Sequence, residues 1–398
     1  LTMFHHEMWR DETRVWMILC NDNLKQIYND VRFEGHLFLW HTILFPFVKS
    51  GVNIAIMQLI SALSCIAAVI LFMFKAPFDK FIKFLFVFSS GMLYFLPIIA
   101  RPYCLIPLLM FILAYLYHDR LKKHYQYLIT LILLSQTHCF MWGFFFICSV
   151  LFLIEIFTKI LKQKDLKLLV VPAISILYFG YLFFTYKEVF FNNTWVPNLS
   201  KTFFAFTIND FSFIKKFFEI NHFMGIVWLI SLILMFIFLF KHNKKSCIIY
   251  CFSIIYILYM FSKVWSYGIL PQKIFLVILI MVTCLWIAVS NIQNLSKVFK
   301  YCITTISVLF FISPVSVFLV LDDINNSMTN TQEVAKKLKG NPAAVLYNPY
   351  VTGDNFHANN INIAYEEQIK DVNNTENIIK EICKDIKYIV ISDDLNYP

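Results

Sequence analysis

Long apolar segments follow one another through most of this chain, and they constrain its fold more than any other feature. Stretches of roughly 20 apolar residues recur between Asn53 and Leu321, and a helix needs about that length to span the hydrocarbon core of a bilayer. Of all residues, 59% are hydrophobic and only 15% are charged. This composition excludes a soluble domain and predicts an all-α polytopic membrane protein.

The apolar stretches predict about ten membrane spans. They lie at 53–74, 84–100, 102–118, 126–157, 168–186, 223–240, 246–262, 272–290 and 300–320. The stretch 126–157 is too long for one straight helix and is interrupted by Gln136-Thr137-His138. We therefore predict that it forms two short, tilted helices.

Basic residues cluster in the connections on one side of the predicted bundle. Short cytoplasmic loops accumulate lysine and arginine, so we expect this side to face the cytoplasm of a plasma membrane or cell inner membrane. The clusters are Lys75/Lys80/Lys83, Arg120/Lys122/Lys123, Lys159/Lys162/Lys164/Lys167, Lys241/Lys244/Lys245 and Lys297/Lys300. They account for most of the net charge of +9, which we interpret as a topology signal and not as a nucleic-acid footprint.

The opposite, extracytoplasmic face receives the segments expected to form the active site. These are the acidic N-terminal stretch, the Arg101-Pro102-Tyr103 corner, the Thr137-His138 corner, the 187–222 loop and the C-terminal tail. In the 187–222 loop, Trp195, Pro197 and Phe203-Phe204 can contact a sugar or an acceptor, although aromatic residues at a membrane edge also serve as anchors.

The chain divides into three predicted regions. Residues 1–50 form an extracytoplasmic first loop with interfacial helices, 51–321 the transmembrane bundle, and 322–398 a small extracytoplasmic α/β domain. The pattern in the last region predicts an amphipathic helix near 330–339, strands at Ala343–Tyr347 and Lys387–Ile391, and a helix at Thr375–Asp385. Because the chain starts at Leu1 with a polar segment, we expect a further span ahead of it. The ten cysteines fall mostly in apolar spans and are interpreted as buried hydrophobic residues, not as a disulfide framework.

The first loop carries groups that suit sugar transfer from a lipid-linked phosphate. Such a reaction needs a base or electrostatic partner for the acceptor and cations for the departing phosphate. Asp11 or Glu12 can deprotonate or orient the acceptor, and Glu34 can assist. The candidate phosphate ligands are Arg14, Arg32 and Arg101. An alternative stays open, because adjacent acids often stabilise a helix start and an interfacial arginine such as Arg101 often extends its charge to water.

Histidines in the same region leave a metal requirement open. His5, His6, His36 and His41 can ligate a metal ion, yet interfacial histidines more often form hydrogen bonds. Glu34 can help to hold a divalent ion. No spacing of cysteines and histidines typical of a metal site occurs.

Several of these segments resemble the successive blocks of bacterial GT-C class glycosyltransferases. The matching runs are Asp11-Glu12-Thr13-Arg14, Arg32-Phe33-Glu34-Gly35-His36-Leu37-Phe38-Leu39-Trp40, Gln58-Leu59-Ile60-Ser61-Ala62-Leu63, Ala76-Pro77-Phe78 and Arg101-Pro102-Tyr103. The resemblance to protein mannosyl and aminoarabinose transferases is more distant. Leu37 stands where the most similar branch has proline, and Gln58 stands where those two transferases have arginine.

The resemblance implies an inverting transferase that uses a polyprenyl-phosphate sugar donor and a glycan, lipid or protein acceptor. It implies an essential aspartate in the first outer loop, which is Asp11 here, and an outer C-terminal domain. On this basis the catalytic candidates are Asp11, Glu12 and Glu34. The substrate-binding candidates are Arg14, Arg32, His36, Arg101, Tyr103 and His138.

Two other functions stay open from the sequence. A transporter or flippase of lipid-linked saccharides would place ionisable groups in mid-membrane segments or break its helices in two matching halves. Only Glu155 lies well inside an apolar run, the chain has 9 glycines, and no internal repeat is visible. An inactive scaffold descended from an enzyme would tolerate loss of its acidic residues.

Overall fold

The computed structural model is mostly helical, with several helices long enough to cross a membrane. It describes residues 6, 8, 10–21, 23–31, 37–89, 91–164, 166–191, 223–264, 271–290, 321, 331–347, 362–368 and 388–391. Within this part of the chain, four helical segments have the length and apolarity of a membrane span: Ile56–Lys75, Pro102–Asp119, Cys139–Gln163 and Leu166–Tyr186. The chain is therefore that of a multi-pass membrane protein.

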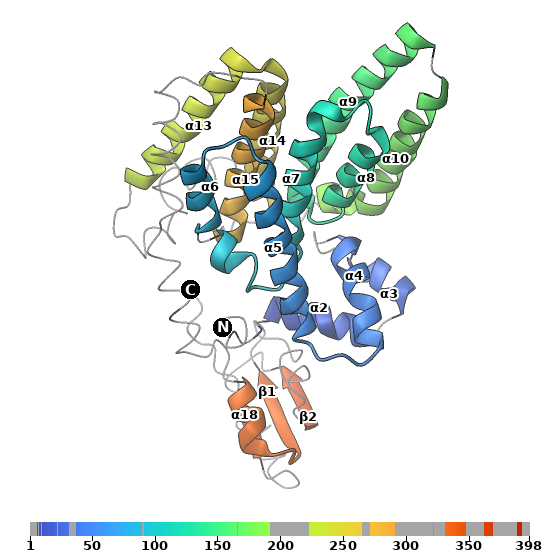
Figure 1. Ribbon diagram of the computed structural model, residues 1–398. Helices are drawn as coiled ribbons and strands as arrows, with labels where there is room; N and C mark the ends of the chain where they lie inside the picture. The colour runs from blue at the N-terminus through green and yellow to red at the C-terminus, as the bar shows by residue number, and fades with distance from the viewer. Residues whose placement is uncertain are drawn as a thin grey trace.

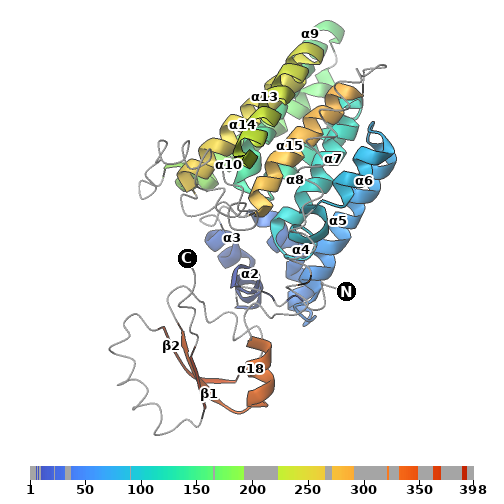
Figure 2. The same cartoon turned by 90° about the vertical axis from the view of Figure 1, so that its left-hand side faces the viewer.

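Three helices precede the first of these spans: α2 (Arg10–Asn21), α3 (Leu24–Val31) and α4 (Phe38–Lys49). The Asn23 side chain begins α3 by accepting hydrogen bonds from the backbone N–H groups of Lys25 and Gln26, both at 3.1 Å. The chain at the start of α4 donates backbone hydrogen bonds to the turn that follows residue 135, from Leu37 to Thr137 and from Leu39 to Gln136. These three helices lie together at one end of the bundle (Figures 1 and 2).

The bundle is built around α7. Its main helices are α5 (Ile56–Lys75), α7 (Ile106–Leu116), α8 (His124–Ser135), α9 (Trp142–Gln163), α10 (Val170–Phe191), α13 (Phe223–His242), α14 (Lys244–Val264) and α15 (Pro271–Val289). The span that contains α7 is 72% buried, whereas the span Leu166–Tyr186 is 28% buried, so α7 is central and α10 peripheral. Helix α7 contacts α5, α8 and α15, while α14 contacts α9 and α15.

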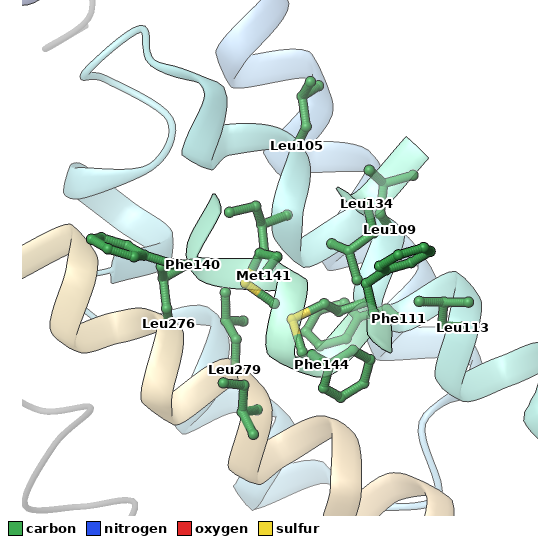
Figure 3. Packing of buried hydrophobic residues seen from close by; sticks show 14 of the residues in the cluster. Leu105, Leu109, Phe111, Leu113, Leu134, Phe140, Met141, Phe144, Leu276 and Leu279 are labelled. Atoms are coloured by element: carbon green, nitrogen blue, oxygen red, sulfur yellow. The ribbon is translucent and has the colours of Figure 1, made fainter. Parts of the chain in front are cut away.

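Aromatic and aliphatic side chains fill the space between these helices. Phe111 of α7, Phe144 of α9 and Leu279 of α15 are all fully buried and point into one shared interior (Figure 3). The Phe111 ring lies 4.9 Å from that of Phe72 and 5.8 Å from that of Trp286. Because lipid is as apolar as these side chains, close packing rather than exclusion from water holds such helices together.

Most of the stretches that hydropathy predicts as spans coincide with helices in the described part of the chain. The division of 126–157 at Gln136-Thr137-His138 is confirmed, because α8 ends at Ser135 and α9 begins at Trp142. However, α9 has 22 residues and is not short. The stretches 223–240, 246–262 and 272–290 coincide with α13, α14 and α15. The expected span 300–320 lies outside the described residues.

The prediction of one continuous span at 84–100 is wrong. The chain forms the short helix α6 (Lys80–Val87), then a π-helical turn at Gly91–Phe95 and further turns up to Ala100. Pro97 cannot donate a backbone hydrogen bond, which interrupts a helix. A Cβ atom added at Gly91 would lie 2.3 Å from the Phe275 ring, so glycine lets α15 approach this turn closely. Apolarity over 17 residues therefore did not produce a helix of that length.

Basic side chains gather at the end of the bundle away from α2, which we call the basic end. The segment Pro102–Asp119 has 18 residues, so its two ends lie about 27 Å apart if it is helical throughout. At its far end, Glu155 of α9 pairs with Arg120 at 2.5 Å and with Lys245 at 2.6 Å. Lys159 donates a hydrogen bond to the Leu121 carbonyl at the same end. The basic clusters of these connections thus share one end of the bundle, as their spacing predicts.

A small α/β unit follows the bundle. Helix α18 (Thr331–Leu338) precedes three parallel strands, β1 (Ala343–Tyr347), β2 (Ile363–Gln368) and β3 (Tyr388–Ile391), in the order β2-β1-β3. The predicted helix near 330–339 and both predicted strands are confirmed. Strand β2 was not predicted, because its Glu366-Glu367 pair breaks the apolar pattern. The expected helix at Thr375–Asp385 lies outside the described residues.

Candidate functional site

The first turn of α2 brings Asp11 against the corner that precedes α7. An Asp11 carboxylate oxygen lies 3.1 Å from Nη1 of Arg101, and the Asp11 side chain is 34% exposed while that of Arg101 is 5% exposed. Arg101 has an extended backbone and begins the short helix Pro102–Leu105. The carboxylate is thus the part of this ion pair that a substrate can reach, whereas the guanidinium is held inside.

Tyr103 and His138 lie beside this pair, each from one of the two predicted corners. The Tyr103 hydroxyl lies 3.0 Å from Nε2 of His138, the two rings stack with centroids 4.8 Å apart, and the Arg101 guanidinium lies over the Tyr103 ring. Nδ1 of His138 accepts the backbone N–H of Phe140 at 3.1 Å. A neutral imidazole that accepts at Nδ1 carries its proton on Nε2, so His138 donates to the Tyr103 hydroxyl oxygen.

The charge state of His138 follows from its surroundings. The residue is fully buried in the connection between α8 and α9. Burial lowers the pKa of His138 well below its usual value, and the positive charges of Lys273 and Arg101 lower it further. The imidazole is therefore neutral at physiological pH and serves as a hydrogen-bonding group.

Lys273 is a functional candidate that the sequence analysis missed. It lies in the first turn of α15 and is only 1% exposed. Its charge interacts with those of Arg101 and Asp11 and with His138. In the sequence it stands at the edge of the apolar stretch 272–290, which hydropathy predicts as a span. The signal available was its place on the side opposite the basic clusters, where lysine is uncommon.

Glu12 takes a different place from its neighbour Asp11. Its carboxylate is completely buried, lies 3.1 Å from Nε2 of His6, and accepts the backbone N–H of Ala100 at 2.6 Å. The backbone carbonyl of His6 accepts a hydrogen bond from the Gln58 side chain on α5 at 3.1 Å. Glu12 therefore joins the N-terminal segment to the corner that carries Arg101.

The structure brings four of the predicted site residues together: Asp11, Arg101, Tyr103 and His138. Arg14 is exposed on α2. His41 is buried in α4. The remaining candidates, Glu34, Arg32, His36 and His5, lie outside the described residues, as do Trp195, Pro197 and Phe203-Phe204.

The described residues contain neither a candidate metal site nor a disulfide bond. No group of three or more histidine, cysteine, aspartate or glutamate side chains there is arranged to hold a metal ion. Of the ten cysteines in the chain, the eight described are free thiols, mostly buried. The predicted role of those eight as small buried residues is confirmed for all but Cys20, which is exposed, and Cys251, which is partly buried.

Comparison of the chain with protein families, curated proteins and solved structures finds no match. The arrangement of the site must therefore carry the functional argument. Its central feature is a partly exposed carboxylate paired at 3.1 Å with a buried guanidinium.

Proposed function

We propose that this protein is an integral membrane glycosyltransferase of the GT-C type. It transfers a sugar from a polyprenyl-phosphate donor to an extracytoplasmic acceptor. The observation that carries the proposal is the 3.1 Å pair between the partly exposed Asp11 and the buried Arg101, formed where α2 meets the end of a membrane-spanning bundle. At that depth the phosphate of a polyprenyl donor meets the site while its tail stays in lipid.

In the proposed reaction Asp11 accepts the proton of an acceptor hydroxyl. The hydroxyl oxygen forms a bond to the anomeric carbon as the bond from that carbon to the phosphate oxygen breaks. The bonding electrons pass to the phosphate, which leaves as polyprenyl phosphate, and the single displacement inverts the anomeric centre. Arg101 and Lys273 stabilise the charge of the leaving phosphate, because fixed cations in a buried site act more strongly than in water.

The proposed placement in the membrane follows from charge. The basic end faces the cytoplasm, and the end that carries Asp11 faces the outside. The α/β unit formed by α18 and the three strands lies beyond α2 in both views (Figures 1 and 2), so we assign it to the same outer side.

The position of Glu155 favours a transferase over a transporter of lipid-linked saccharides. A transporter would use an intramembrane carboxylate such as this one along its pathway. Glu155 is instead paired at the basic end with Arg120, in the connection between α7 and α8, and with Lys245 of α14. Its carboxylate there joins helices, which is a structural role.

The experiment that tests the proposal measures glycosyl transfer from radiolabelled polyprenyl-phosphate sugars in membranes that carry the full-length protein. We expect Asp11→Asn to reduce transfer by about 100-fold or more at unchanged protein level, because a proton acceptor is lost. The matched control is Asp79→Asn: Asp79 caps α6 through the Ile82 N–H, and asparagine caps equally well. If the wild type transfers no sugar, or if Asp11→Asn transfers as well as the wild type, the proposal is wrong.

A further inference from the structure

Two neighbouring acids at the start of α2 have different surroundings. We propose that Glu12 is a positioning residue, which fixes Arg101 opposite Asp11, and that only Asp11 meets the substrate. The consequence for catalysis rests on the proposed function, whereas the positioning itself is a property of the fold. The sequence alone had placed both acids among the catalytic candidates.

Burial separates the two carboxylates. The Asp11 side chain is 34% exposed, and that of Glu12 is not exposed at all. The 2.6 Å hydrogen bond from the Ala100 N–H to Glu12 is short even for a bond to a charged acceptor. An acceptor hydroxyl therefore cannot reach Glu12 while this bond and the contact with His6 persist.

Adjacent residues of α2 hold adjacent residues of the corner. The Glu12 carboxylate accepts the backbone N–H of Ala100, and the Asp11 carboxylate pairs with the side chain of Arg101. The chain on both sides of the corner is also attached to α5, since Ser61 donates a 2.7 Å hydrogen bond to the Leu96 carbonyl and Ser64 a 3.1 Å one to the Cys104 carbonyl. Loss of the hydrogen bond between Glu12 and Ala100 would leave the backbone just before Arg101 free to move away from α2. The Arg101 guanidinium would then be less restricted to its position beside Asp11.

Replacement by glutamine distinguishes positioning from proton transfer. The side-chain oxygen of glutamine can accept the Ala100 N–H, and its NH₂ group can donate to Nε2 of His6 when that nitrogen is unprotonated. Glu12→Gln therefore preserves the positioning contacts but cannot act as a base. Glu12→Ala removes both contacts, and Glu12→Asp keeps a carboxylate but shortens it by one methylene group.

The test is the rate at which phenylglyoxal modifies Arg101 in the purified full-length protein, measured by mass spectrometry of peptides. We expect Glu12→Ala and Glu12→Asp to raise this rate by about tenfold, as loss of a hydrogen bond to a charged group allows, and Glu12→Gln to stay within about twofold of the wild type. Arg120, at the basic end, is the internal control, and its rate should not change. Glu12→Asp gives the answer if Glu12→Ala does not fold.

The outcomes separate this proposal from the proposed function. Unchanged protection of Arg101 in Glu12→Ala and Glu12→Asp would overturn the positioning role, and so would equal increases at Arg101 and Arg120, which indicate general unfolding. In the transfer assay, Glu12→Gln should keep most of its activity, whereas Asp11→Asn should lose it. Loss of activity in both variants would show that Glu12 is catalytic and would contradict the proposal. If the wild type transfers no sugar, the proposed function fails, yet the modification rates still decide whether Glu12 positions Arg101.

Discussion

At the scale of single residues, the site depends on a neutral histidine held between two corners. His138 donates from Nε2 to Tyr103 and accepts at Nδ1 from the backbone of Phe140. Protonation at Nδ1 would break the second bond and place a third positive charge near Arg101 and Lys273. Sequence placed Arg101, Tyr103 and His138 on one face because their corners share a side of the bundle. It could not divide roles between Asp11 and Glu12, because burial depends on tertiary contacts.

This arrangement predicts how stability depends on pH. The pKa of His138 is lowered in the folded protein and is close to 6.5 in the unfolded chain, so below about pH 6.5 the unfolded state binds more protons. Folding stability should therefore fall as the pH drops below this value. We expect the loss in thermal midpoint between pH 7.5 and pH 5.5, about one unit on either side of that value, to be smaller in His138→Gln. Equal losses in this variant and the wild type would contradict the prediction.

At the scale of secondary-structure elements, two glycines allow close packing against a neighbouring helix. A Cβ atom at Gly91 would lie 2.3 Å from the Phe275 ring, and one at Gly143 of α9 would lie 2.4 Å from the Tyr256 ring of α14. Hydropathy predicted most helices here, since an apolar run that crosses a bilayer must satisfy its own backbone. It failed at 84–100, where an interrupted segment is buried against α15 by contacts that a hydropathy window does not include.

Added methyl groups at these contacts should destabilise the bundle. We expect Gly91→Ala and Gly143→Ala each to lower the free energy of unfolding by about 1–3 kcal/mol, because the facing rings must move. Gly180→Ala on α10 is the matched control: nothing lies within 4 Å of its added Cβ, and alanine favours a helix. Thermal denaturation in detergent measures the three variants side by side. The close-approach interpretation fails if all three are equally stable.

At the scale of the whole molecule, the basic end and the candidate site lie at opposite ends of the bundle. The basic end holds the basic clusters of the connections and the Glu155 ion pairs, and the other end holds Asp11, Arg101 and Lys273. Lys25 and Lys49 also lie away from the basic end but are exposed, whereas Lys273 is buried. A buried lysine at this end needs a reason other than topology. Binding of an anionic lipid phosphate provides such a reason in the proposed function. Because the basic end and the end with Asp11 are then on opposite sides of the membrane, the protein must have one defined orientation.

Orientation is testable with single-cysteine variants in intact cells. Cys20 on α2 is an exposed thiol, Lys162 is exposed at the end of α9, and Lys337 is exposed on α18. In a background without other cysteines, a membrane-impermeant maleimide should label Cys20 and Lys337→Cys from outside but label Lys162→Cys only after the cells are opened. If Lys162→Cys is the only one of the three labelled in intact cells, the orientation is the reverse of the one proposed. The Asp11 site then faces the cytoplasm. An extracytoplasmic acceptor would then be out of reach, so this measurement constrains the substrate before any transfer is detected.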